Sequence, residues 1–357
     1  MKTTDSLVSK KRRSPIFWVP TAYFGMGLPF VVLNMVAVLM YKGLGVSDAK
    51  IAFWTSLIML PWTLKPLWSP LLEMYRTKKF FVVLTQMVSG VTFGLIALSL
   101  HLPSFFAITI ALFAIVAFSG ATHDVACDGV YMDELNAQEQ AKYIGWQGAF
   151  YNVAKIIGTG LLVYLAGFLK DEYEGPAEDA VLYSWTVIMI VLGGVMFALG
   201  LYHTRMLPSG KHAHSVTSFS QSMAELWNVI RNFFTKKHIF YYICFIILYR
   251  LAEGFIMKIA PLFLRASREV GGLGLSLKEI GTLNGVFGSA AFVLGSLLAG
   301  IYVSKFGLKR TLFTLCCIFN LPFLAYTFLA VTQPTNVYLI GTCITCLLYT
   351  SPSPRDA

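Results

Sequence analysis

The sequence predicts an all-α membrane protein that crosses the bilayer many times. Of its 357 residues, 56% are hydrophobic and only 13% are charged, which is not the balance of a soluble domain. The apolar residues gather in runs of about twenty, the length that a helix needs to cross the hydrocarbon core. An internal repeat indicates in addition that the helices form two related bundles.

Nine membrane spans and the beginning of a tenth can be placed along the chain. The first contains Pro20 and Pro29, lacks a cleavage pattern behind it and is followed by more spans, so we do not interpret it as a removed signal peptide. The expected spans are residues 16–40, 51–72, 80–101, 104–124, 143–169, 181–203, 239–264, 280–304 and 311–331, with a tenth starting near Val337.

The repeat consists of GLGVSDAKI at residues 43–51 and GLGLSLKEI at residues 272–280, each before the second span of a set. The same offset carries Gly25 onto Gly254, and a basic turn follows the next span in both places. Repetition of this kind is typical of secondary transporters, in which two homologous halves are related by a parallel repeat.

The repeat divides the chain into five parts. We expect a six-helix bundle over residues 16–204 and part of a second bundle over residues 239–345. Residues 1–15 form a basic amino terminus, and residues 205–238 form a polar linker with an amphipathic surface helix. Residues 346–357 look like a translated sequencing adapter, so we expect about nine to ten helices of an intended twelve, with the second bundle truncated.

Basic residues are distributed unequally between the two sides of the predicted membrane. Seventeen lie in loops on the side of the amino terminus and six on the other side. By the positive-inside rule the amino terminus is cytoplasmic. The net charge of +10 is therefore explained by topology, and we expect the lipid bilayer rather than nucleic acid as the partner.

We expect no cofactor, no metal and no enzymatic activity. The six cysteines lie within or beside apolar spans without metal-ligand spacing. His212 and His214 lack a third ligand nearby, so a solvated loop explains them better than a metal site. A nucleophile with its base is not found either, which disfavours an enzyme.

The fourth span ends in the most informative polar residues of the chain. Gly120, Asp124, Asp128 and Tyr131 fall on one helix face, and Asp124 lies about 30 Å from the start of the span, at the expected cytoplasmic edge. Ionisable groups near membrane depth are costly and mark function.

Two interpretations of these aspartates stay open. In one, the two carboxylates form a protonatable site and His123 relays the proton. In the other they form a gate that pairs with the basic turn from Arg76 to Lys79, assisted by Glu73.

Three further charged positions lie deeper and are candidates for a solute site. Lys155, which shares a face with Asn152, lies about 18 Å into the fifth span and would attract an anion. In the seventh span, Tyr249 precedes Arg250 and Glu253, which either neutralise each other or face a cavity.

Two other lysines are ambiguous. Lys65, between two prolines and two tryptophans, either binds an anion or extends toward the interface. Lys258, nearer the outer surface, is a candidate for snorkelling.

Four segments resemble one family in particular: Gly27-Leu28-Pro29, PWTLKPLWSP at residues 61–70, ATHDVACDG at residues 121–129 and YRLAE at residues 249–253. Through them the chain is similar to the AmpG-type branch of the major facilitator superfamily, which contains muropeptide permeases and relatives that include acetyl-coenzyme A transporters. His123 stands where the branch commonly has glutamine.

The resemblance implies a two-bundle fold and import driven by protons across a bacterial inner membrane by a monomer. Its best-known cargo is a small anionic solute, an anhydro-muropeptide. Lys155 and Arg250 would suit the carboxylates of such a cargo, and Trp146, Tyr151 and Tyr249 would stack on its sugars. The alternatives are an acetyl-coenzyme A or other organic-anion carrier of the same fold and, from another class, a membrane sensor or enzyme.

Overall fold

The computed structural model describes residues 13–69, 72, 76–177, 179–209, 219–288, 305–306, 314, 317 and 323–349, with some side chains of the helices after residue 218 left out. The regular secondary structure of these residues is helical, as predicted. Five helices among them are long and apolar enough to cross a membrane: Pro15–Gly43, Lys78–Ser99, Phe105–Glu134, Ala137–Asp171 and Ala180–Met206.

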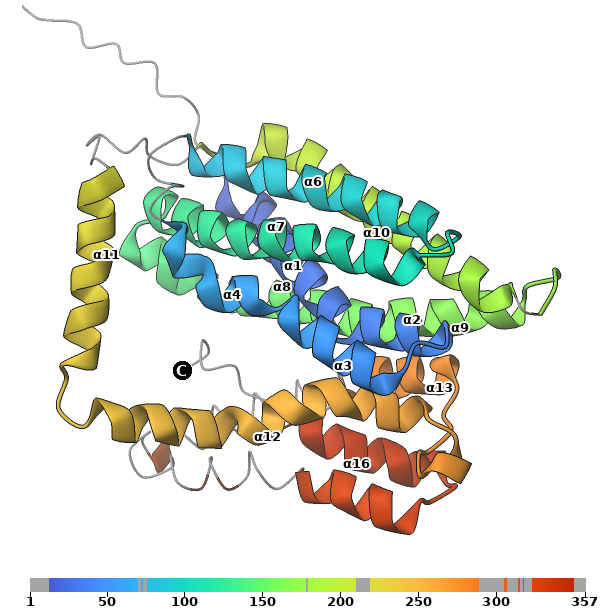
Figure 1. Ribbon diagram of the computed structural model, residues 1–357. Coiled ribbons are helices and arrows are strands. Elements are labelled where there is room, and N and C mark those ends of the chain that lie inside the picture. Colours follow the sequence, from blue (N-terminus) through green and yellow to red (C-terminus); the bar gives the residue numbers. More distant parts are fainter. Residues whose placement is uncertain are drawn as a thin grey trace, which may run out of the picture.

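The first half is a bundle of long helices (Figure 1), and its core is apolar and buried. Tyr41, Phe93, Phe113 and Trp185 are among its fully buried side chains. Its elements are η1 (Pro15–Phe17), α1 (Val19–Val31), η2 (Val32–Val36), α2 (Ala37–Gly43), α3 (Asp48–Leu57), α4 (Leu60–Leu64), η3 (Lys65–Leu67), α6 (Lys78–Ser99), α7 (Phe105–Glu134), α8 (Ala137–Ile156), η4 (Ile157–Leu162), α9 (Val163–Asp171) and α10 (Ala180–Met206).

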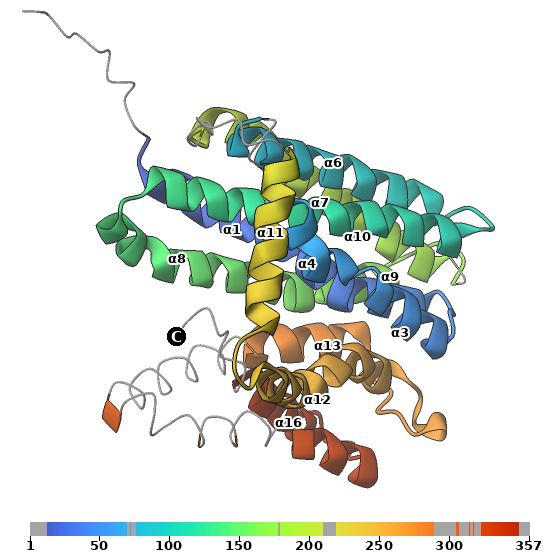
Figure 2. The ribbon, with the colours of Figure 1, turned by 60° about the vertical axis from the view of Figure 1, so that its left-hand side comes forward.

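The next described helix is α11, which lies in the expected linker and crosses the ends of the other helices at a steep angle in both views (Figures 1 and 2). The chain turns from α11 into α12 at His238, whose φ of 63° is left-handed. The elements are α11 (Phe219–Phe234), α12 (Ile239–Arg265), η5 (Arg268–Val270), α13 (Leu277–Thr282), η6 (Leu283–Phe287), a helix over Phe323–Thr332 and α16 (Val337–Tyr349).

The second predicted span is broken into α3, α4 and η3. Pro61 and Pro66 have no amide hydrogen and cannot complete the helical ladder. The Met59 amide donates to the carbonyl of Ser56, three residues back. The proline-rich segment therefore bends where the sequence predicted a kink.

Helix α7 extends ten residues beyond Asp124, where the fourth span was expected to end. The sequence predicted a helix that continues at least to Tyr131, and the helix ends at Glu134. The reason for the extension is that the polar residues of its last turns have partners: Asp128 accepts a hydrogen bond from Tyr23, and Asp133 pairs with Lys78. Asp124 is thus ten residues from the end of the helix, and its expected position at the cytoplasmic edge of the membrane stays a prediction.

Three segments, η2, η4 and η6, are π-helical. Such segments are rare and frequent at functional sites. η4 contacts both η2 and η6, so the three segments meet where the first half adjoins the second.

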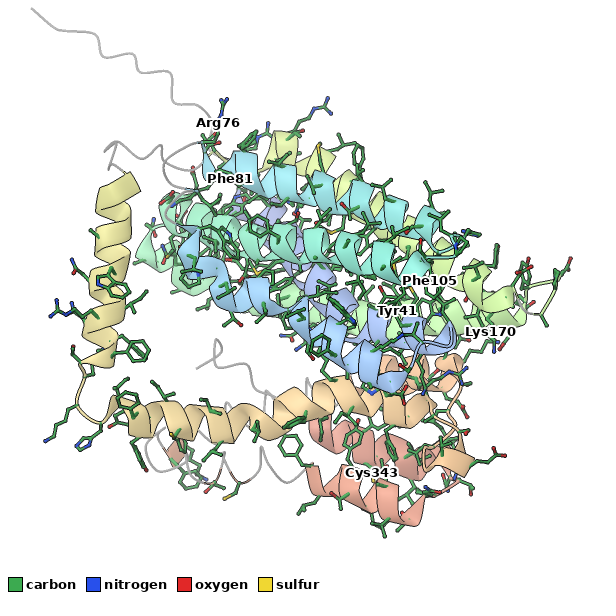
Figure 3. All side chains as sticks on the ribbon, viewed as in Figure 1. Tyr41, Arg76, Phe81, Phe105, Lys170 and Cys343 are labelled. Atoms are coloured by element: carbon green, nitrogen blue, oxygen red, sulfur yellow. The ribbon has the colours of Figure 1, made fainter. Side chains whose placement is uncertain are left out.

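The two halves touch near the end of the molecule that is remote from α11. There α13 packs on α9 and η4, while α12 contacts α2, η2 and α3. Figure 3 marks the two ends of the first half: Arg76 lies at the end nearer α11, and Lys170 lies at the opposite end.

Candidate functional site

The segment α4 to η3 packs against α7 through three residues spaced three apart. Trp62 covers Gly120, where an added Cβ would lie 2.8 Å from the indole ring. The Trp68 indole nitrogen donates to the Thr122 hydroxyl at 3.2 Å. A spacing of three stacks side chains on one face of a 3₁₀-like segment, so Lys65, midway between the tryptophans, also faces α7.

Lys65 and Asp124 form an ion pair inside this contact. The Asp124 side chain is 5% exposed and that of Lys65 is 27% exposed. Removing a carboxylate from water costs several kcal/mol unless a partner compensates it, and Lys65 is that partner. The sequence motifs predict separate roles for Lys65 and Asp124, whereas the structure brings them together.

The polar residues in the following turns of α7 contact α1 and α6. The Tyr23 hydroxyl donates to Asp128 Oδ1 at 2.8 Å, and its ring meets Tyr131 edge to face. One turn later Lys78 Nζ lies 3.0 Å from Asp133 Oδ2. The side chain of Lys78 crosses α7 at Gly129, the residue whose missing Cβ leaves room for it.

The predicted latch with the basic turn remains a prediction. The Arg76 guanidinium lies over the ring of Phe80, 5.7 Å from its centroid. Lys79 is in the first turn of α6, and Glu73 lies outside the described residues.

A buried polar network that the sequence analysis missed lies beside this face. His123 Nε2 is 3.0 Å from Gln86 Nε2, and the other end of the same amide, Oε1, is 2.7 Å from His203 Nδ1. His203 Nε2 in turn lies 2.9 Å from the Thr21 hydroxyl. These residues belong to α7, α6, α10 and α1, so the network joins four helices. A sequence signal could have revealed this network. It is a set of polar residues inside apolar spans, each at a similar distance from the predicted cytoplasmic end of its span.

The residues expected to bind solute on the fifth span lie just before the π-helical segment η4. Asn152 is buried, and its amide donates to the Gly148 carbonyl at 2.9 Å. Lys155 is partly buried. Tyr151 faces Phe30 of α1, with ring centroids 6.3 Å apart, whereas the exposed Trp146 stacks on its neighbour Phe150.

Other predicted residues cannot be placed as side chains. Tyr249, Arg250 and Glu253 belong to α12, but their side chains lie outside the described part. His212 and His214 also lie outside it. Among the described residues, no group of three His, Cys, Asp or Glu could hold a metal ion.

Comparison with known proteins gives one consistent result. The chain is 24% identical over 306 residues to the anhydromuropeptide permease of Escherichia coli K12, covering 83% of this chain and 57% of that protein. It is 20% identical over 269 residues to the putative transporter AmpG 3 of Rickettsia prowazekii, covering 71% and 59%. The chain thus spans less than two thirds of the length of these curated relatives.

The fold is also found among solved structures. The crystal structure of the nucleoside transporter NupG matches with a TM-score of 0.67 at 11% identity, over 94% of this chain and 78% of that one. The family model described as Major Facilitator Superfamily matches residues 21–351. With its apolar membrane-spanning helices, the chain is an integral membrane protein that belongs to the Major Facilitator Superfamily and resembles its AmpG-type permeases.

Proposed function

We propose that this protein is a secondary active transporter that imports a small anionic solute together with protons. The observation that carries the proposal is the ion pair of Lys65 and Asp124, which unites a protonatable acid with a cation inside one helix contact. No catalytic chemistry is required of either residue.

The pair links proton binding to anion binding by simple charge balance. A proton on Asp124 removes the negative charge that holds Lys65. The freed ammonium group then attracts a carboxylate of the solute, because an uncompensated charge at this depth is costly. Release of the proton restores the pair and expels the solute, so the two ligands bind and leave together.

Alternating access is supported by the contacts between the halves. Lys278 Nζ lies 2.9 Å from Asp171 Oδ2 at the end remote from α11. Nearby, Gly160 of η4 lies so close to Gly285 of η6 that an added Cβ would overlap its backbone. With the amino terminus in the cytoplasm, this closed end faces outward, as expected of an inward-facing state.

An anhydro-muropeptide is the cargo we propose, because the chain resembles the Escherichia coli permease of that name. Its carboxylates suit Lys65 and Lys155, and the rings of Trp146 and Tyr151 offer faces for its sugars. An acetyl-coenzyme A or organic-anion carrier of the same fold is the rival.

Uptake of labelled anhydro-muropeptide into proteoliposomes, with and without an imposed pH gradient, tests the proposal. Uptake should rise with an inward-directed proton gradient, and absence of flux under both conditions would contradict transport. Counterflow against unlabelled acetyl-coenzyme A separates the rival cargo.

Single substitutions separate the roles of the acids. Asp124→Asn and Asp128→Asn are compared in proton-driven uptake and in counterflow, which needs no gradient. We expect Asp124→Asn to lose uptake and keep counterflow. Loss of both activities would favour a gate over proton coupling.

A further inference from the structure

Another intramembrane lysine, Lys258, bridges the two halves of the molecule. Lys258 lies in α12, and its ammonium group donates to the backbone carbonyl of Thr55 in α3, at 3.2 Å. Thr55 is 1% exposed. The side chain therefore reaches into the protein, and the expectation that it snorkels to the outer surface was wrong.

The carbonyl of Thr55 is available because α3 ends two residues later. In a continuing helix it would accept from the amide of Met59, but that amide donates to Ser56. A carbonyl freed at membrane depth needs another donor, and Lys258 supplies it from the second half.

This contact satisfies the carbonyl, but a backbone carbonyl does not neutralise the charge of the lysine. A carbonyl oxygen carries no net charge, and no described carboxylate pairs with Lys258. A cation between packed helices without an acid is unfavourable, and such residues mark the paths of charged solutes. Lys258 is partly buried between α12 and the first half, near the end at which the halves touch.

We propose that Lys258 is the residue that captures the anionic solute from the outer side. When the halves separate at this end, Lys258 loses the carbonyl of Thr55, and its charge faces the opening. A carboxylate of the arriving solute then takes the place of the carbonyl. This inference rests on the proposed import of an anion. It assigns the first binding of the solute from outside to Lys258, which lies at a different place from the pair of Lys65 and Asp124.

Uptake kinetics in proteoliposomes of the full-length protein test the proposal. The probes are labelled anhydro-muropeptide and the same compound with its peptide carboxylate amidated. Lys258→Gln should raise the KM of the anionic probe about tenfold with little change in maximal rate, and should raise that of the amidated probe much less. Lys258→Arg, which keeps the charge, should stay within about threefold of wild type.

Lys278→Gln is the matched control, because it also removes a lysine that bridges the halves. Lys278→Gln should change the KM values of the two probes by the same factor. If Lys258→Gln raises the KM values of both probes equally, or leaves both unchanged, Lys258 is only a structural link between the halves and the proposal fails.

If the wild-type protein transports neither probe, the proposed function is contradicted. Thiol labelling still tests the proposal for Lys258 in that case. In a background without native cysteines, Lys258→Cys should react with a charged, membrane-impermeant thiosulfonate added from outside. Lys50→Cys, at an exposed position, is the positive control. If the control reacts and Lys258→Cys does not, the lysine never faces outward and the proposal is overturned.

Discussion

The Nδ1 atom of His203 lies 2.7 Å from the Oε1 atom of Gln86, in the interior of the first half. A side-chain amide has one donor end and one acceptor end. In this orientation His203 carries a proton on Nδ1, while His123 accepts from the amide nitrogen of Gln86. A single glutamine therefore fixes the protonation pattern of two buried histidines on different helices.

Gln86→Leu should destabilise the first half by removing the shared partner. His123 and His203 would each keep a buried ring nitrogen without its hydrogen bond, which costs about 1–3 kcal/mol for each group. The apparent Tm in detergent should fall by several degrees. Gln138→Leu, at an exposed position of α8, should leave Tm nearly unchanged, and an equal loss in both variants would show that the network contributes nothing.

Lys65 and Asp124 should show strong energetic coupling. Lys65→Gln leaves the Asp124 carboxylate buried without its ion-pair partner and should cost about 2–4 kcal/mol. The double variant with Asp124→Asn should be more stable than the sum of the single effects predicts, by at least about 1 kcal/mol. Thermal unfolding of the four proteins completes the cycle, and additive effects would mean that the pair does not act as a unit.

Gly160→Ala should separate the halves at the end where they touch. An added Cβ would lie 2.9 Å from the Gly285 amide nitrogen, a contact that only a backbone shift relieves. Distances between spin labels on α9 and α13 should lengthen relative to wild type. Gly194→Ala, where an added Cβ meets nothing within 4 Å, should leave the label distances unchanged.

The ion pair of Lys278 and Asp171 should persist through the alkaline range. The hydrogen bond to Asp171 raises the pKa of Lys278 above its usual value. A raised lysine pKa means that the contact is fully present below pH 10 and is lost only as the pH rises through the raised value. Label distances between α9 and α13 should therefore be constant from pH 7 to 9. They should lengthen at 0.5 M salt or on Lys278→Gln, because exposed ion pairs are screened; lengthening by pH 9 would contradict this reasoning.

Five of the six spans expected in the first half correspond to helices long and apolar enough to cross a membrane, because their signal, about twenty apolar residues in a row, is local. The sequence also predicted the bend near Pro61, because the proline signal is local. The partnership of Lys65 with Asp124 was not predicted, because the residues lie in separate motifs that meet only after helices pack. The link from Gln86 to His203 depends in the same way on the packing of α6 and α10.

The partners of the polar residues in the last turns of α7 were missed for a related reason. A hydropathy pattern treats Asp128 and Asp133 as residues that leave the membrane, whereas partners on α1 and α6 keep them in a helix. Polar residues that are satisfied by other helices are invisible to a pattern that considers each segment alone.

The π-helical segment η4 has a consequence for any alignment or engineering of this chain. A π segment is equivalent to one residue inserted into an α-helix, because its wider turn takes up the extra residue and leaves the helix on both sides in phase. Deleting one residue from Ile157–Leu162 would therefore return this stretch to an α-helix and keep α9 in phase with α8. Deleting one residue from α9 before Gly167 would instead turn the rest of the helix by about 100°. Gly167, which packs against the start of α13, would then turn away from the second half.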